Sequence, residues 1–235
     1  MLLTDSSGQP THVAGVPPDY FSEDGQLWGN PLYDWQSQKE SGFAWWIERL
    51  NQAALRYDMV RIDHFRGFDA YWTVPAGETT ARTAEWVPGP GDDILAVDGK
   101  NPQDLASVAE DLGVITDSVT QLRERQGLPG MRVLQFELFD PKCNLDEIPE
   151  NCVCYTGTHD NDTTVGWFSG SSCDKAARRE AKKLRKIALK LTNGSLESLH
   201  LDLVRLAFST RARVAIVPMQ DFLGLGSEAR LNMPG

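Results

Sequence analysis

The stretch VRIDHFRGF, residues 60–68, places an arginine, an aspartate, a histidine and a second arginine among apolar residues. The alternation of apolar side chains with Arg61 and Asp63 predicts a short strand over 59–63 that has both charged side chains on one face. A core strand should avoid charge, because an unpaired buried ion costs several kcal/mol. A lone aspartate at a strand end most often belongs to a turn or a cap, so the meaning of this cluster depends on the other strand ends.

Strand and helix patterns alternate along the rest of the chain. Short apolar and alternating runs predict five strands, over 59–63, 106–113, 131–138, 152–162 and 213–221. Apolar residues at helical spacing predict helices over 41–57, 116–126, 174–191 and 196–211. We expect Ser41 to cap the first helix and Asn101–Pro102 to begin a further one. This order is typical of the α/β class, in which helices cover a parallel sheet.

Two segments are predicted to be loops. Residues 1–40 combine Gly, Pro and Asp with five aromatic residues, which is more aromatic surface than a linker needs. Residues 75–93, PAGETTARTAEWVPGPGDD, are a second long loop.

The composition limits the partners that the chain can have. The 235 residues carry a formal net charge of −10, which argues against binding to nucleic acid, whose phosphates favour basic surfaces. A neutral substrate such as a sugar remains compatible with this charge. No stretch approaches the roughly 20 apolar residues of a membrane span, so we expect no membrane partner. The first ten residues, MLLTDSSGQP, have neither the basic nor the long apolar region of a signal peptide, so a cytoplasmic protein is expected.

Two patterns that suggest other functions fail on their details. The four cysteines, at 143, 152, 154 and 173, lack the paired spacing of a metal site and are expected to be free thiols. A calcium loop that began at Asp160 would need glycine at its sixth position and glutamate at its twelfth, where the chain has Val165 and Ser171. The basic run of the predicted helix over 174–191 is interpreted as a solvated helix face.

Three carboxylates fall at three of the predicted strand ends. Asp63 ends one strand, Glu110 follows the next, and Asp160 comes after a later one. Chemistry in α/β proteins gathers at the carboxyl ends of parallel strands, so these acids can converge on one pocket. Breaking a glycosidic bond requires a carboxylate that attacks the anomeric carbon and a protonated carboxyl that gives its proton to the leaving oxygen. Arg61, on the same strand face as Asp63, can keep that carboxylate ionised.

Six stretches carry a more specific signal: VAGVPPDYFSEDGQLWGNPLYDW (13–35), VRIDHFRGF (60–68), AEDLG (109–113), GMRVLQFE (130–137), YTGTHDNDTTVGW (155–167) and QDFLGLGSEARLNMPG (220–235). Together they resemble the 4-alpha-glucanotransferases called amylomaltase or disproportionating enzyme, glycoside hydrolase family 77. The resemblance implies a (β/α)8 TIM barrel of the alpha-amylase clan. It implies transfer of α-1,4-glucan segments between maltooligosaccharide, starch or glycogen chains, with retention of configuration and without a cofactor or metal.

The same resemblance implies roles for the three acids. Asp63 resembles the nucleophile and Glu110 the general acid/base of the family. Asp160 resembles the third acid, which holds sugar hydroxyls and favours distortion of the ring. Retaining chemistry would place the carboxyls of Asp63 and Glu110 about 5–5.5 Å apart.

The resemblance also implies that eight further residues bind substrate: Arg61, His64, His159, Trp28, Tyr20, Gln26, Phe136 and Asn232. Arg61 and His64 would flank the nucleophile, and His159 would lie beside the third acid. The aromatic loop over 1–40 would form a flexible lid on the acceptor side, where an aromatic face can stack on a sugar ring.

The family's chains are about twice as long as this one. The resemblance therefore implies one partial catalytic barrel domain over 1–235, which has the aromatic loop over 1–40 and the strands that carry the acids over 59–235. Its five strands would be the fourth to the eighth of the barrel, and an N-terminal segment that carries the first three would be a required partner. Because an open sheet leaves two unpaired edges, we expect the isolated chain to associate and to have little transferase activity.

Two other functions remain open at this point. An amylase-like hydrolase would use the same acids and differ only in that water resolves the covalent intermediate, although an aromatic lid that excludes water favours transfer. A truncated barrel could also bind glucans without turning them over, but a pure binder has no use for a nucleophile and an acid together.

Overall fold

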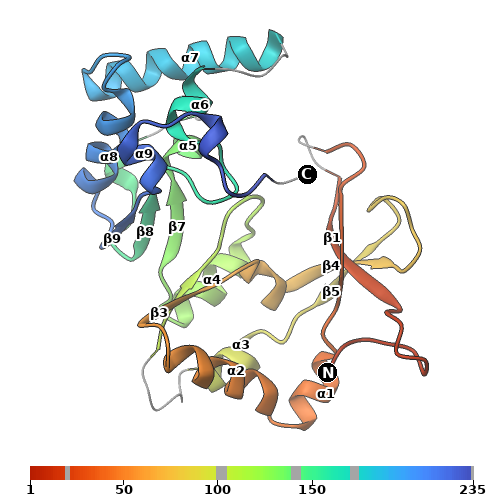
Figure 1. Ribbon diagram of the computed structural model, residues 1–235. Coiled ribbons are helices and arrows are strands. Elements are labelled where there is room, and N and C mark those ends of the chain that lie inside the picture. Colours follow the sequence, from red (N-terminus) through yellow and green to blue (C-terminus); the bar gives the residue numbers. More distant parts are fainter. Residues whose placement is uncertain (19–21, 99–104, 139–143, 170–174, 234–235) are drawn as a thin grey trace. The chain divides into compact units, whose positions relative to one another are not determined.

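The computed structural model describes residues 1–18, 22–98, 105–138, 144–169 and 175–233 (Figure 1). The chain forms two compact units, Met1–Leu128 and Pro129–Gly235. No helix in the described residues is long and apolar enough to cross a membrane. Tyr20, two of the cysteines and the helix start expected at Asn101–Pro102 lie outside the described residues.

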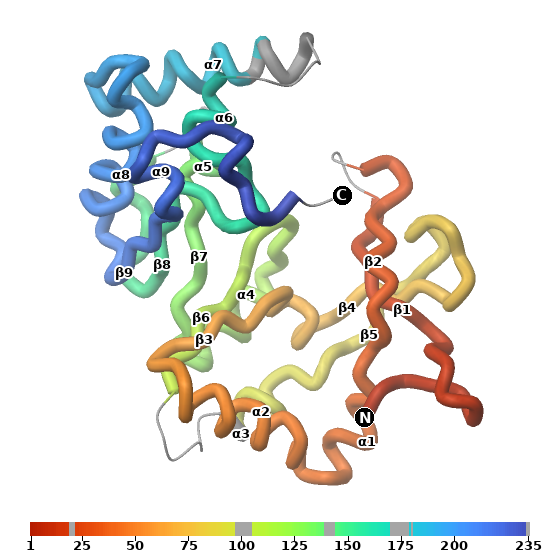
Figure 2. The backbone as a smooth tube through the Cα atoms, in the orientation of Figure 1, coloured from red at the N-terminus to blue at the C-terminus, as the bar shows by residue number. Residues whose placement is uncertain are grey.

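The first unit contains a four-stranded antiparallel sheet that the sequence analysis missed. Its strands are β1 (His12–Val16), β2 (Gln26–Pro31), β4 (Ala70–Pro75) and β5 (Glu85–Pro88), in the order β2-β1-β4-β5, and Figure 2 shows β2 alongside β1. The expectation of loops over 1–40 and 75–93 is therefore wrong. The outer strands β2 and β5 are almost wholly exposed, so they lack the alternation of apolar and polar residues by which a half-buried strand is recognised.

A parallel strand pair in the same unit confirms the two strands predicted before Asp63 and Glu110. β3 (Met59–Ile62) pairs with β6 (Ala106–Ala109) so that Ile62 lies opposite Ala109. The pairing continues one step further, because the Glu110 N–H donates to the Ile62 carbonyl at 2.9 Å. The two acids that follow these strands therefore emerge at the same edge.

Helices and one buried cluster support this strand pair. The helices are α1 (Trp35–Glu40), α2 (Ala44–Ala54), α3 (Asp92–Asp98) and α4 (Asp117–Arg125), with a 3-10 turn η1 (Phe65–Phe68). The expected cap at Ser41 is wrong, because Ser41 ends α1, and Phe43 precedes α2 with a left-handed φ of 56°. Such a φ is unfavourable for an aromatic residue. The Phe43 side chain is buried in a cluster with Ile62 and Phe65, which offsets that cost.

The second unit is a three-stranded parallel sheet with helices. β7 (Gly130–Val133), β8 (Cys152–Tyr155) and β9 (Val214–Ile216) pair in that order. The helices are α5 (Leu134–Glu137), α6 (Thr164–Ser169), α7 (Lys175–Thr192), α8 (Leu199–Ser209) and α9 (Met219–Leu223), and 3-10 turns lie at η2 (Leu145–Glu147) and η3 (Ser227–Ala229). The predicted strands exist but are shorter, because the chain turns into α5 at Leu134 and into α9 at Met219. The long helices predicted over 174–191 and 196–211 are confirmed as α7 and α8.

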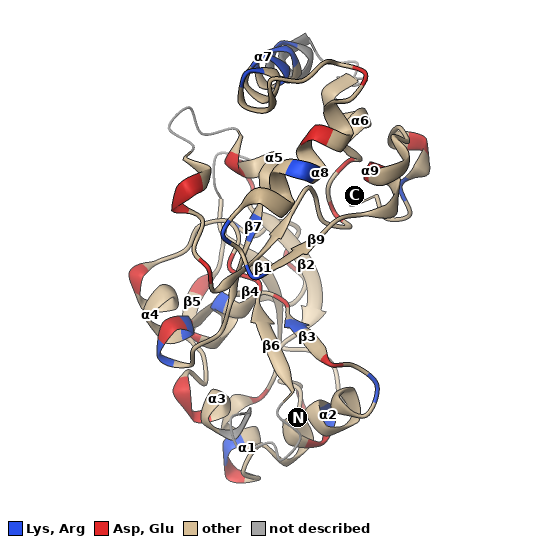
Figure 3. Ribbon diagram, turned by 90° about the vertical axis from the view of Figure 1, so that its left-hand side faces the viewer, with Lys and Arg blue, Asp and Glu red and all other residues tan. Residues whose placement is uncertain are grey.

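Two smaller predictions about this unit are confirmed. Cys152 and Cys154 are buried free thiols, and burial raises the pKa of the Cys154 thiol to about 12. The basic residues of α7 gather along the helix in Figure 3. Four of its lysines are exposed: Lys182, Lys183, Lys186 and Lys190. This matches the predicted solvated helix face.

Candidate active site

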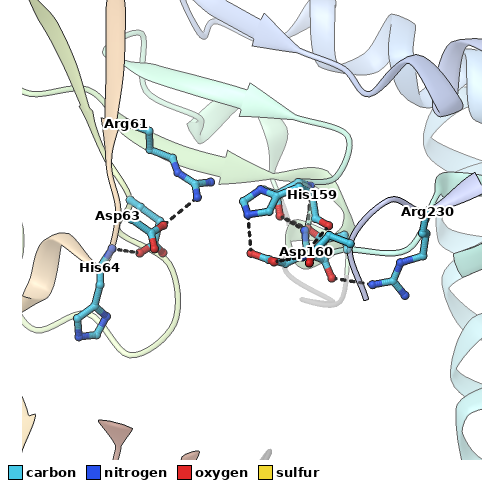
Figure 4. Close-up of polar contacts among 10 residues, drawn as sticks. Arg61, Asp63, His64, His159, Asp160 and Arg230 are labelled. Atoms are coloured by element: carbon cyan, nitrogen blue, oxygen red, sulfur yellow. Dashed lines mark hydrogen bonds and ion pairs between the residues drawn. The ribbon is translucent and has the colours of Figure 1, made fainter. Parts of the chain in front are cut away.

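Asp63 stands immediately after β3 and is paired with an arginine from that strand. Arg61 Nη2 lies 2.8 Å from Asp63 Oδ1, as the alternation of side chains along the strand predicts (Figure 4). The Asp63 side chain is 72% exposed, so it remains accessible to a ligand. An exposed ion pair contributes little to stability. Its main consequence is therefore to fix the position of a negative charge at the strand end.

Glu110 stands immediately after β6 and is more buried than Asp63. Its Oε2 accepts a hydrogen bond from the His64 N–H at 2.8 Å, and Oε1 accepts one from the Leu112 N–H at 3.0 Å. Burial raises the pKa of the Glu110 carboxyl and the charge of Asp63 adds to this effect, against the lowering by the two N–H groups and Arg61. Glu110 therefore keeps its proton to a higher pH than an ordinary glutamate does, as a general acid must.

His64 connects the two acids to the antiparallel sheet. It has a left-handed φ of 47°, the conformation in which its N–H reaches Glu110. The ring of Trp28, from β2, meets the His64 ring edge-on, with centroids 4.8 Å apart. Burial and the charge of Arg66 lower the pKa of His64, although Asp63 opposes this. An exposed aromatic side chain therefore contacts the residue that follows Asp63 and donates its N–H to Glu110.

A polar residue of β2 forms a hydrogen bond with this tryptophan. Trp28 Nε1 donates to Gln26 Oε1 at 3.1 Å, and Trp28 is 43% exposed. Both residues belong to a strand rather than to the loop that the sequence suggested. Tyr20, which was grouped with them, lies outside the described residues.

The segment that carries Glu110 is anchored by a buried ion pair. Arg123 Nε, from α4, lies 3.2 Å from Asp111 Oδ2, and the two side chains are only 10% and 6% exposed. Arg123 Nη1 also donates to the Leu128 carbonyl at 3.0 Å. Sequence reasoning missed this pair, because Arg123 resembles any charge on the outer face of a helix. The two adjacent acids in AEDLG were the available signal that one of them needs a cation beside it.

His159 and Asp160 lie in the second unit, on the segment between β8 and α6. His159 Nε2 is 3.4 Å from Asp160 Oδ2, and both side chains are more than half exposed (Figure 4). Asn232 Nδ2 donates to Asp160 Oδ1 at 2.7 Å, and Arg230 donates to the Asp160 carbonyl oxygen at 3.1 Å. The structure therefore brings together three of the predicted site residues, and Arg230 is an addition to them.

Phe136 differs from its prediction in local structure. It was expected on a strand over 131–138, but it lies on the short helix α5 and is 47% exposed. The chain turns here because the Gln135 N–H bonds to the Thr156 carbonyl and the Leu138 N–H to the Leu134 carbonyl. Its neighbour Gln135 is buried and donates to the Asp162 carbonyl at 2.8 Å, so the segment before α6 is held from this side too.

Two neighbouring strand ends carry an ion-paired carboxylate and a partly buried carboxyl of raised pKa, and retaining enzymes that act on glycosidic bonds use a pair of carboxyl groups. The sequence model of the 4-alpha-glucanotransferase family, glycoside hydrolase family 77, matches residues 2–235. The chain belongs to this family.

Named relatives agree with this assignment. The chain is 51% identical over 240 residues to the 4-alpha-glucanotransferase of Synechocystis sp., covering 99% of this chain and 46% of the relative. It is 47% identical over 238 residues to that of Thermus thermophilus, covering 98% and 47%. It is also similar in structure to amylomaltase from Streptococcus agalactiae in complex with acarbose, with a TM-score of 0.87 and 36% identity over 99% of this chain and 46% of that one. The α/β fold class is thereby confirmed, and the chain spans about half the length of the curated relatives that it matches.

Proposed function

We propose that this chain supplies the catalytic carboxyls of an enzyme that transfers α-1,4-glucan segments from one maltooligosaccharide or starch chain to another, with retention of configuration. The observation that carries the proposal is the pair of strand-end acids, of which Asp63 is ion-paired and exposed while Glu110 is partly buried with a raised pKa. The names of its relatives support the same reaction.

In the first step the Asp63 carboxylate attacks the anomeric carbon of the donor. The bond between that carbon and the glycosidic oxygen breaks, and Glu110 gives its proton to the departing oxygen. Arg61 bonds to Oδ1 of Asp63, which leaves Oδ2 to form the covalent bond. The product is a glycosyl ester on Asp63 and a shortened glucan.

In the second step a hydroxyl of the acceptor glucan attacks the same carbon. The Glu110 carboxylate takes the hydroxyl proton, the ester bond breaks, and Asp63 is restored as a carboxylate. Two displacements at one carbon retain its configuration. Water in place of the acceptor would give hydrolysis, so exclusion of water decides the outcome. Trp28 and Gln26 on β2, with Tyr20, are proposed to bind the acceptor sugar there.

Asp160 is proposed to act as the third acid. Its carboxylate can accept hydrogen bonds from two neighbouring sugar hydroxyls and thereby favour the distorted ring of the transition state. Asn232 orients this carboxylate through Oδ1, and His159 lies beside Oδ2. His64, which follows the proposed nucleophile in the chain, and Phe136 are proposed as further contacts to sugar rings.

We also propose that β3, β6, β7, β8 and β9 are the fourth to the eighth strands of a (β/α)8 barrel. On this view residues 1–235 form one partial barrel domain, and the first three strands come from a segment outside this sequence. The parallel pairing within each unit supports it. The activity then belongs to the completed barrel.

The test is disproportionation of maltotriose by two preparations. One is residues 1–235 alone, and the other is the Synechocystis relative with its matched segment replaced by residues 1–235. Transfer yields glucose together with maltopentaose and longer chains, whereas hydrolysis yields only shorter sugars. Transfer by the chimera, lost in Asp63→Asn, supports the proposal. A folded chimera that binds acarbose but turns nothing over would contradict it.

A further inference from the structure

A buried carboxylate binds both flanks of the segment that carries His159 and Asp160. This segment, residues 157–163, joins β8 to α6. Asp221, on α9, is only 1% exposed. Its Oδ2 accepts from the Thr156 hydroxyl at 2.6 Å, and its Oδ1 accepts from the Thr164 N–H at 2.7 Å. One side chain therefore binds the residue before the segment and the residue after it.

Both partners of Asp221 are themselves fixed. Thr156 and Thr164 are fully buried, and Thr156 accepts a backbone hydrogen bond from Gln135 while Thr164 begins α6. The distance between the ends of the 157–163 segment is thus set by a single carboxylate whose oxygens cannot separate. Because the segment is short, its ends determine where Asp160 points.

A second contact from the same part of the chain holds the segment near the end that leads into α6. Ser227, on η3, donates its hydroxyl to Asp162 Oδ2 at 2.7 Å. Asn232 also bonds to the Asp160 carboxylate, so the stretch 221–232 binds the 157–163 segment at Asp162, at Asp160 and at the two residues that flank it. The last part of the described chain therefore acts as a clamp on this segment.

Stability alone does not account for a carboxylate at position 221. Burying a carboxylate without a cation beside it is unfavourable, and among the described residues no cation is paired with Asp221. Charge-assisted hydrogen bonds from a hydroxyl and a peptide N–H offset part of this cost. A leucine, whose side chain has the same branched arrangement of four heavy atoms, would avoid this cost, so the carboxylate is better explained by the geometry that it imposes.

We propose that Asp221 is a positioning residue for glucan transfer, which acts by holding the 157–163 segment so that Asp160 meets the sugar hydroxyls. The proposal rests on the proposed function of Asp160. A misplacement of about 1 Å in a catalytic group can cost about 100-fold in rate. Loss of the clamp should therefore lower kcat more than it raises KM, because the distorted transition state depends on alignment more than the bound substrate does.

The first experiment tests the clamp through backbone mobility and needs no enzymatic reaction. Backbone hydrogen exchange is measured by mass spectrometry in residues 1–235 for wild type, Asp221→Leu, Asp221→Asn and Thr156→Val. We expect exchange over 157–164 to rise about 10-fold or more in Asp221→Leu, less in Thr156→Val, and least in Asp221→Asn, whose amide can still bond to both partners. Exchange over β7 should not change. Unchanged exchange over 157–164 in a folded Asp221→Leu protein would overturn the proposal.

The second experiment asks whether Asp221 acts through Asp160. Asp221→Leu, Asp160→Asn and the double variant form a cycle, with kcat and KM measured in the preparation that transfers maltotriose. We expect Asp221→Leu to lower kcat about 10- to 100-fold alone and hardly at all in the Asp160→Asn background. If the kcat of the double variant falls by the product of the two single losses, the two residues act independently and the proposal is overturned. Full activity of Asp160→Asn would instead refute the proposed function of Asp160, while the exchange result would stand.

A matched control separates positioning from loss of stability. Leu203 on α8 is fully buried in the core of the same unit and does not belong to the clamp. Leu203→Ala should lower the melting temperature of the unit, as truncation of a buried leucine does, and leave kcat unchanged at temperatures where the protein is folded. An equal loss of kcat in Leu203→Ala and Asp221→Leu would contradict a positioning role.

Discussion

Glu110 and Asp160 both follow parallel strands, but the two units surround them differently. Glu110 is partly buried, accepts two backbone hydrogen bonds and has a raised pKa. Asp160 is more than half exposed and is bound by the side chain of Asn232. An acid that must give and take a proton needs a shifted pKa, which burial provides. An acid that must grip sugar hydroxyls needs exposed, oriented oxygens.

The anchors of the two segments differ in the same sense. In the first unit the buried carboxylate of Asp111 is matched by the positive charge of Arg123. In the second, Asp221 is bound by a hydroxyl and an N–H group. An ion pair stabilises the unit only while both partners are present. A carboxylate with two neutral donors fixes a distance instead. In both units a buried carboxylate therefore anchors the segment that carries the acid, through an ion pair in the first unit and through two neutral donors in the second.

The largest expected effect is that of Asp63→Asn. An amide cannot form the glycosyl ester, so transfer of maltotriose should fall by roughly 10⁴-fold or more. Arg61 and His64 keep their positions, so the affinity for acarbose, measured by calorimetry, should change little. Turnover near the wild-type rate would remove Asp63 from the mechanism.

Glu110→Gln should have the next largest effect. Without a proton donor, transfer from maltooligosaccharides should fall by about 10²- to 10⁴-fold. Transfer from a maltosyl fluoride, whose leaving group needs no proton, should fall far less in the first step. The alkaline limb of the wild-type pH profile reports loss of the Glu110 proton, and the raised pKa moves it to higher pH. Equal losses on both donors would speak against the acid role.

Arg123→Met tests the anchor of the Glu110 segment. It leaves Asp111 buried without its cation, so we expect a loss of about 3–5 kcal/mol in the free energy of unfolding of the first unit. Adding Asp111→Asn should recover part of that loss, because the uncompensated charge is then removed. The measurement is urea unfolding of the wild type, Arg123→Met and the double variant. A further loss in the double variant would contradict the buried-charge explanation.

Trp28→Ala should affect the substrate and not the fold. We expect KM to rise up to about 10-fold or hydrolysis to increase relative to transfer, since one stacked aromatic contributes about 0.5–1.5 kcal/mol, with little change in melting temperature. Trp86, on β5 of the same sheet, is exposed to a similar degree and serves as the control. The same kinetic change in Trp86→Ala would remove the special role of Trp28.

The smallest effect concerns stability and pH. The folded-state pKa of Glu110 lies above its usual 4.5, so the folded protein binds more protons than the unfolded chain between these two values. The stabilising contribution is therefore present below about pH 4.5 and is lost as the pH rises through the folded-state pKa. From about pH 4 to 7, Glu110→Gln should gain stability relative to wild type in urea unfolding. A relative gain by wild type would reverse the assigned direction.

Much of the parallel framework could be predicted from sequence, because β3, β6 and β8 are short apolar strands followed by polar residues. The antiparallel sheet could not, since its outer strands are exposed and carry no alternating pattern. Asp63 and Glu110 were found through their strand ends. Asp221 was missed, because its partners are 65 and 57 residues away in the chain and nothing local distinguishes it from a helix-start aspartate.

The most direct test of the central claim is to trap the glycosyl ester. Glu110→Gln is mixed with a maltosyl fluoride in the preparation that transfers maltotriose, and the protein is digested and sequenced by mass spectrometry. Donation without acid help should form the ester, and the missing base should slow its removal. The account predicts a maltosyl group on Asp63. A maltosyl group on Asp160 instead, or turnover of the fluoride with no labelled protein and inverted configuration, would contradict it.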